Sequence, residues 1–214
     1  MLIDPYIYCV DLLKEKTLSE MESKIRGLRQ GMSRLKTIVE SPRYKEKIDI
    51  SYPDEYTQIS WYRDCIMYAR TLYEQAGGVY KPSKLEEKDN EFDARIEMIE
   101  TIKFTRSESF KDDRTLTVSF AGEDVVLRKS LPFSGYSEQI VMKRSKTIWL
   151  ERFRDAHIGE WRRSYNSERY GISVNDVKQW ELEIVYQDVK RKKYDGSNVY
   201  PFSYNELLVL FELI

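Results

Sequence analysis

The sequence has 214 residues, of which 41% are hydrophobic and 33% are charged, and 16 of them are tyrosines. This composition is too apolar and too aromatic for a disordered chain, so it predicts a folded protein with a highly charged surface. No run approaches the roughly 18 consecutive apolar residues that a membrane-spanning helix needs, which excludes such a helix.

The first residues and the two cysteines predict the cellular compartment. The start MLIDPYIYCVDLLKEK has acidic residues where a secretory signal peptide needs basic ones. Cys9 and Cys65 lie in apolar or helical surroundings and form no CxxC motif, which favours buried, reduced thiols over a disulfide. We therefore expect a cytoplasmic protein of a bacterium, or of something that infects one.

Residues 17–39 have the periodicity of a long helix. Seven apolar residues are separated by alternating steps of three and four, as in the seam of a coiled coil: Leu18, Met21, Ile25, Leu28, Met32, Leu35 and Val39. The same spacing returns between Ile59 and Tyr73 and ends at Gly77-Gly78. The sequence therefore predicts an antiparallel helical hairpin over about 17–76. The alternative is that the Leu18–Val39 helix pairs with its own copy in a homodimer, although we favour a monomer.

A third helix is predicted to start at Ser83, which forms a capping box with Glu86. The apolar period then falls to two, typical of strands, in the segments 101–109, 114–120, 125–131, 179–187 and 190–195. Two short helices are predicted between these strands, around 147–155 and 159–167. The expected fold class is α+β, with an N-terminal helical region over 1–78 and, over 79–214, an antiparallel sheet flanked by helices.

The chain closes with a strand, a turn and a helix. Gly196 and Asn198 are expected to adopt positive φ in the turn, and Ser203 with Glu206 is expected to form a second capping box. The stretch 180–210 reads W-x-L-x-I-x-Y, a turn, and then G-S-N-x-Y-P before an amphipathic helix. It resembles the ends of uncharacterised proteins of Firmicutes and their mobile elements, and this resemblance implies no activity.

The motifs of common enzymes are absent from the sequence. His157 is the only histidine, so a site built from several histidines is impossible and a Ser/His/Asp triad would have to use this one residue. There is no GxGxxG, Walker A or HExxH motif. We expect no catalytic residue, no bound metal and no cofactor.

One acidic group gives an alternative function. Magnesium nucleases hold their metal ion with carboxylates near a strand end and place a lysine beside them. Glu181, Glu183, Asp188 and Lys190 could form such a site in a metal-dependent nuclease or phosphodiesterase. However, Glu181 and Glu183 alternate with Trp180, Leu182 and Ile184, so both are also typical of the solvent face of a strand.

Basic residues gather in the C-terminal part of the chain. Residues 140–194 contain 13 Lys or Arg against 8 Asp or Glu, interleaved with aromatic residues. Such a surface suits phosphates, stacked bases or an acidic protein, although it can also be simply solvated or protect a sheet edge. The predicted partner-binding residues are Arg152, Arg154, Trp161, Arg162, Arg163, Lys190, Arg191, Lys192 and Lys193.

Together these observations favour a non-catalytic interaction protein. We expect it to dock on a protein or ribonucleoprotein partner, and direct contact with nucleic acid is one form that this docking could take. In this role it would act as an inhibitor or accessory factor of a mobile element or phage, of the anti-defence type. The metal-dependent nuclease is the alternative.

Overall fold

The structure is a computed structural model that describes residues 2–46, 53–107, 113–130, 139–171 and 178–213. The chain divides into two compact units, Met1–Pro82 and Ser83–Ile214. We call them the helical unit and the sheet unit and describe each by itself. No helix among the described residues is both long and apolar enough to cross a membrane.

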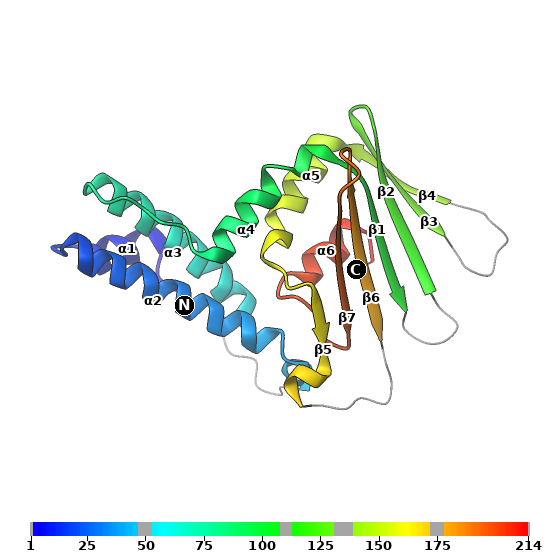
Figure 1. The fold of residues 1–214 in the computed structure, drawn as a ribbon. Coiled ribbons are helices and arrows are strands. Elements are labelled where there is room, and N and C mark those ends of the chain that lie inside the picture. The colour runs from blue at the N-terminus through cyan, green and yellow to red at the C-terminus, as the bar shows by residue number, and fades with distance from the viewer. Residues whose placement is uncertain (1, 47–52, 108–112, 131–138, 172–177, 214) are drawn as a thin grey trace. The chain divides into compact units, whose positions relative to one another are not determined.

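The helical unit contains α1 (Pro5–Leu13), α2 (Leu18–Val39), the short 3-10 helix η1 (Pro42–Glu46) and α3 (Glu55–Gln75). Local hydrogen bonds set where each helix begins. Thr17 and Glu20 form a capping box at α2, and the side chains of Asp4 and Asp54 cap α1 and α3. Helices α2 and α3 pack against each other as an antiparallel hairpin (Figure 1), which confirms the predicted hairpin.

The seam predicted from the heptad spacing faces the interior of this hairpin. Met21, Ile25, Leu28 and Val39 are buried, whereas Leu18 at the start of α2 is 40% exposed. Cys9 and Cys65 are free, buried thiols, and the Cys9 Sγ donates to the carbonyl oxygen of Cys65 at 3.1 Å. The two cysteines thus join α1 to α3 without a covalent bond.

The sheet unit begins with α4 (Lys84–Asp93), whose start at Ser83 carries the predicted capping box. The 3-10 helix η2 (Ile96–Met98) leads into a sheet of seven strands. Their bounds are β1 (Ile99–Ser107), β2 (Asp113–Ala121), β3 (Asp124–Ser130), β4 (Gln139–Ser145), β5 (Ser164–Asn166), β6 (Gln179–Tyr186) and β7 (Arg191–Ser197). The remaining elements are α5 (Lys146–Asp155), η3 (Ile158–Glu160), η4 (Ser167–Tyr170) and α6 (Tyr204–Leu210).

The strands lie in the order β4-β3-β2-β1-β6-β7-β5, and every neighbouring pair is antiparallel except β5 with β7. Alternate residues of the central strands, among them Ile102, Phe104, Leu182 and Ile184, are fully buried. Helices α4, α5 and α6 lie on that side of the sheet (Figure 1). The fold class is α+β, as the sequence predicts.

Two local predictions in this unit are wrong. The segment 159–167 is not a helix: it contains η3 and then β5, which pairs in parallel with β7. The sequence also gave no sign of β4 as a strand. Strand β5 has only three residues, and it pairs with β7, about thirty residues further along the chain. Such pairing overrides local helical preference.

Ser203 does not form the predicted capping box. Its side chain makes no hydrogen bond to the start of α6. Instead it is buried, accepts a hydrogen bond from Trp161 Nε1 at 2.9 Å and donates one to the carbonyl oxygen of Ala156 at 2.5 Å. A buried indole N–H requires an acceptor, and Ser203 provides it.

The turn before α6 agrees in part with the prediction. Asn198 has a φ of 57°, in the left-handed region, and its Oδ1 accepts a hydrogen bond from the backbone N–H of Lys178 at 2.9 Å. Gly196 is not among the residues with positive φ. Glycine is required there because the indole of Trp180 occupies the space that a Cβ would fill.

Candidate functional site

Aromatic residues of the predicted basic surface belong to the core. Trp161 is 1% exposed, so it offers no surface for a partner to contact, and the set of partner-binding residues stays a prediction. Trp149, Phe153 and Tyr165 are buried as well. In α5 the aromatic residues recur at helical spacing and point toward the sheet, whereas arginines take the outer positions. The expected mixture of exposed aromatic and basic side chains is therefore not formed by these residues.

The arginines of the predicted surface lie in different environments. Arg152 and Arg163 are exposed. Arg154 forms an ion pair within the sheet unit, with its Nε 3.8 Å from Asp93 Oδ2. Arg162 lies over the ring of Tyr165, with 5.8 Å between the guanidinium carbon and the ring centroid.

The run Lys190–Lys193 is divided between the two faces of the sheet, because successive residues of a strand point to opposite sides. Lys192 lies on the helix-covered side, with its Nζ 5.1 Å from the ring centroid of Phe92, and burial lowers the pKa of its ammonium group. Arg191 and Lys193 point to the other side. The positive charge of this run is therefore not gathered on one surface.

The acidic residues of the nuclease alternative are held in separate ion pairs. The paired atoms are Glu181 Oε2 with Lys193 Nζ at 2.8 Å, Glu183 Oε1 with Arg191 Nη1 at 3.1 Å, and Asp188 Oδ1 with Arg95 Nη2 at 2.9 Å. Asp188 also lies 3.2 Å from Lys190 Nζ, in the turn beyond β6. Among the described residues, these acids form no group that could share a metal ion. The geometry gives the nuclease alternative no support, and it stays an untested prediction.

Exposed apolar residues gather at α1 of the helical unit. Tyr6, Ile7 and Val10 of α1 are 51%, 56% and 37% exposed at helical spacing, and Ile3, just before the N-cap Asp4, is 60% exposed. We call these four residues the α1 stripe. On the opposite side of the helix, Cys9 is fully buried against α3. Helix α1 is thus apolar on both sides, although only one side is covered among the described residues.

The neighbouring surface of α3 extends this stripe. Met67 is 52% exposed, and the ring of Tyr68 packs edge-on against Tyr6 at 5.5 Å between centroids. Three exposed acidic residues belong to the same two helices: Asp4 caps α1, Asp11 lies on α1 and Asp64 lies on α3. The pKa of the Cys65 thiol is raised first by burial and then by Cys9, and Asp64 and Asp4 add to the rise. These two carboxylates therefore lie close to the contact between α1 and α3.

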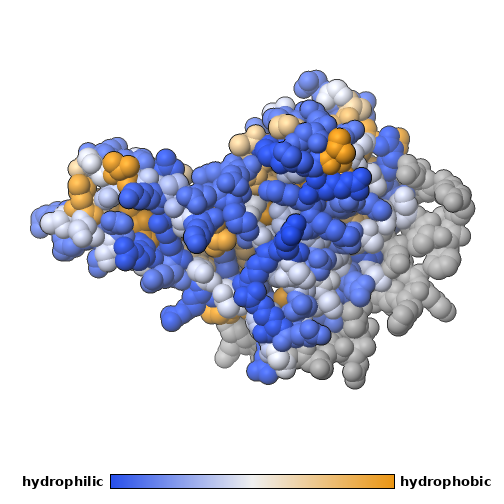
Figure 2. All heavy atoms as spheres, in the orientation of Figure 1, coloured by the Kyte–Doolittle hydropathy of each residue, from blue (hydrophilic) through white to orange (hydrophobic). Residues whose placement is uncertain are grey.

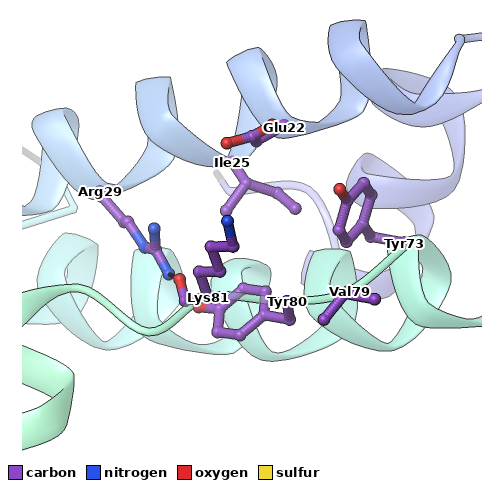
Figure 3. Close-up of a pocket in the computed structure, with 7 residues that line it drawn as sticks. All are labelled: Glu22, Ile25, Arg29, Tyr73, Val79, Tyr80 and Lys81. Carbon is purple, nitrogen blue, oxygen red and sulfur yellow. Dashed lines mark hydrogen bonds between the residues drawn. The ribbon is translucent and has the colours of Figure 1, made fainter.

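A groove of about 250 Å³ lies in the helical unit between α2 and the segment that follows α3 (Figure 3). Ile25 and Tyr73 line it, and Arg29 lies across one end, where its Nη2 donates to the carbonyl oxygen of Lys81 at 2.8 Å. Val79 at its edge is 78% exposed, and Figure 2 shows apolar surface near the end of α3. The groove is smaller than most small-molecule sites, which measure about 300–1,000 Å³. It is of a size to receive one side chain of a partner.

A different arrangement surrounds His157 in the sheet unit. Its Nδ1 lies 2.7 Å from Oδ2 of Asp89, which comes from α4. Glu160, in the 3-10 turn that follows His157, is 7% exposed, and its carboxylate belongs to the same cluster. Asp93 is one helical turn beyond Asp89. Burial raises the pKa of Asp93 to about 6, and the negative charge of Asp89 adds to this, although Arg154 and His157 oppose it.

The sequence analysis missed both the α1 stripe and the histidine cluster. The stripe had a visible signal, since Ile3, Tyr6, Ile7 and Val10 have helical spacing and so do the buried residues on the other side of α1. The cluster had none, because Asp89 and His157 are 68 residues apart. No local motif connects them.

Comparison with known proteins adds no assignment, because the chain matches no known protein family, no curated protein and no solved structure.

Proposed function

We propose that this protein is a non-catalytic interaction protein that binds a protein partner through the α1 stripe. The observation that carries the proposal is the exposure of three large apolar side chains on one face of α1, with a fourth, Ile3, just before the helix, while another face of α1 is already buried. A helix that is apolar on all sides is normally covered on all sides. Contiguous exposed apolar surface is typical of protein interaction sites.

The chemistry around the stripe favours an amphipathic helix with basic flanking residues as the occupant. A row of apolar residues at helical spacing matches the apolar face of a second helix laid alongside it. The exposed carboxylates of Asp4, Asp11 and Asp64 complement lysine or arginine beside that apolar face. The same carboxylates repel an anionic lipid surface or a nucleic acid backbone.

This mode of action is compatible with the expected role as an inhibitor or accessory factor of a mobile element. Such a protein needs only to occupy a surface of its target and requires no reactive group. The groove beside Ile25 and Tyr73 would supply a second, smaller contact for one side chain of the same partner. The role in anti-defence remains part of the proposal.

A capture experiment with paired variants tests the docking surface. Tagged parent protein, the double variant Ile7→Glu/Val10→Glu and the double variant Arg152→Glu/Arg163→Glu are incubated with lysate of the source cells. A protein bound by the parent is then purified, and its affinity for all three is measured. Circular dichroism and melting temperature confirm that each variant is folded. We expect the α1 double variant to lose at least tenfold in affinity and the arginine variant to bind like the parent.

Three results would overturn the proposal. If the arginine variant loses binding while the α1 variant keeps it, the predicted basic surface is the docking site. If sedimentation shows that the parent is a dimer that Ile7→Glu/Val10→Glu dissociates, the stripe contacts a second copy rather than another protein. Failure of the parent to bind any protein directly also counts against the proposal.

A further inference from the structure

Three side chains of the kinds that bind transition metals converge in the sheet unit. One ligand atom each of Asp89, His157 and Glu160 lies within 4.8 Å of the other two. His157 and Glu160 are three residues apart across η3, and residues at that spacing in a 3-10 helix lie on the same side. Asp89 reaches them from α4, which packs against η3. The arrangement therefore depends on two elements distant in the sequence.

A second observation points to a missing ligand. Asp89 is 8% exposed, and its Oδ1 is buried with no hydrogen-bond partner, whereas its Oδ2 contacts His157. A Cβ placed on Gly159 would lie 2.7 Å from this Oδ1, so the oxygen faces the turn that carries the other two residues. An unsatisfied buried carboxylate oxygen is costly to a folded protein, and a cation relieves that cost.

The charges around the cluster also favour a cation. Asp93 has a second buried carboxylate oxygen without a hydrogen-bond partner, one helical turn from Asp89. The other oxygen of Asp93 lies 3.8 Å from Arg154 Nε, while Lys88 Nζ lies 3.2 Å from the carbonyl oxygen of Trp161 and Lys192 Nζ lies over the ring of Phe92. Buried carboxylates are normally paired with a positive charge or coordinate a metal ion.

We propose that Asp89, His157 and Glu160 bind one divalent transition-metal ion, with Zn²⁺ as the best fit. One imidazole nitrogen with two carboxylate oxygens suits Zn²⁺, whereas Mg²⁺ and Ca²⁺ prefer oxygen ligands alone. The ion would tie α4 to the turn after α5. Because two of the three ligands are buried, its effect would be chiefly on the stability of the sheet unit.

The test uses the full chain after removal of metal ions with EDTA. Calorimetric titration with Zn²⁺ should show one ion per chain, and the melting temperature should rise with Zn²⁺ concentration, since an ion that binds only the folded state stabilises it. Co²⁺ should give the visible absorption of a bound ion. Mg²⁺ and Ca²⁺ should have no effect at the same concentrations.

Variants locate the site. Glu160→Gln and His157→Asn should each lower Zn²⁺ affinity at least tenfold. Glu206→Gln is the matched control, because its carboxylate interacts electrostatically with His157 but lies outside the group of three ligands. The proposal is wrong if the parent chain binds Zn²⁺ no more tightly than millimolar, or if both ligand variants bind as the parent does. The parent titration decides the question even if a variant fails to fold.

Discussion

Replacing Ser203 with alanine removes a hydrogen-bond relay in the core of the sheet unit. The Ser203 hydroxyl accepts from Trp161 Nε1 at 2.9 Å and donates to the Ala156 carbonyl at 2.5 Å. Alanine makes neither bond, so the buried indole N–H and the Ala156 carbonyl oxygen both lose this partner. A buried polar group left unsatisfied costs about 1–3 kcal/mol. We therefore expect Ser203→Ala to lower the free energy of unfolding by about 2–4 kcal/mol.

Urea denaturation, followed by tryptophan fluorescence, measures this loss. Three of the four tryptophans, Trp149, Trp161 and Trp180, lie in the sheet unit, so most of the signal reports its unfolding, while Trp61 reports the helical unit. Ser145→Ala is the matched control, because Ser145 stands at the start of α5 and makes no capping hydrogen bond. The relay is refuted if Ser203→Ala unfolds within about 0.5 kcal/mol of the parent, a difference usual for surface substitutions.

Two further predictions concern buried charge. Asp93→Asn should raise the free energy of unfolding by about 1 kcal/mol at pH 8, because burial raises the folded pKa of Asp93 from 3.8 to about 6 and its ionisation then opposes folding. The full pKa shift would correspond to about 3 kcal/mol. Partial exposure and the charges of the surrounding residues Asp89, Arg154, His157 and Asp155 reduce this value. The gain should shrink as the pH falls through about 6 and vanish below about 4 in thermal melts with EDTA, and a difference independent of pH would contradict the cause given. Ile25→Asp should destabilise the monomer by several kcal/mol, since Ile25 is 3% exposed, whereas the exposed Ser23→Asp should not; if sedimentation instead shows only the loss of a dimer, with unchanged melting of the monomer, the homodimer alternative is favoured.

The helical hairpin and the central strands could be predicted because their signals are local. The buried face of α2 shows in the sequence as a heptad spacing of apolar residues, and the capping box of Ser83 and Glu86 marks the start of α4. Alternation along β1, β2, β3 and β6 likewise follows from one buried and one solvated face of the sheet. In each case the sequence carries the complete pattern within one element.

The edge strands and the surface could not be predicted in the same way. Strand β5 has three residues, and its pairing with β7 joins positions about thirty residues apart. The basic run Lys190–Lys193 looks continuous in the sequence, but the pleat of β7 sends Lys192 to the covered face. Composition gives the number of charges in a segment, whereas only strand geometry decides which of them share a surface.

The sequence by itself therefore determined the α+β class, the helical hairpin, the capping of α4 and the central strands, because neighbouring residues encode periodicity and caps. Only the tertiary structure decided that Trp161 is buried, that Ser203 accepts its indole N–H, and that Asp89 meets His157 from 68 residues away. The physical reason is that burial and polar pairing depend on which elements pack together. The packing of these elements minimises the free energy of the whole unit, so it cannot be deduced from any single segment of the sequence.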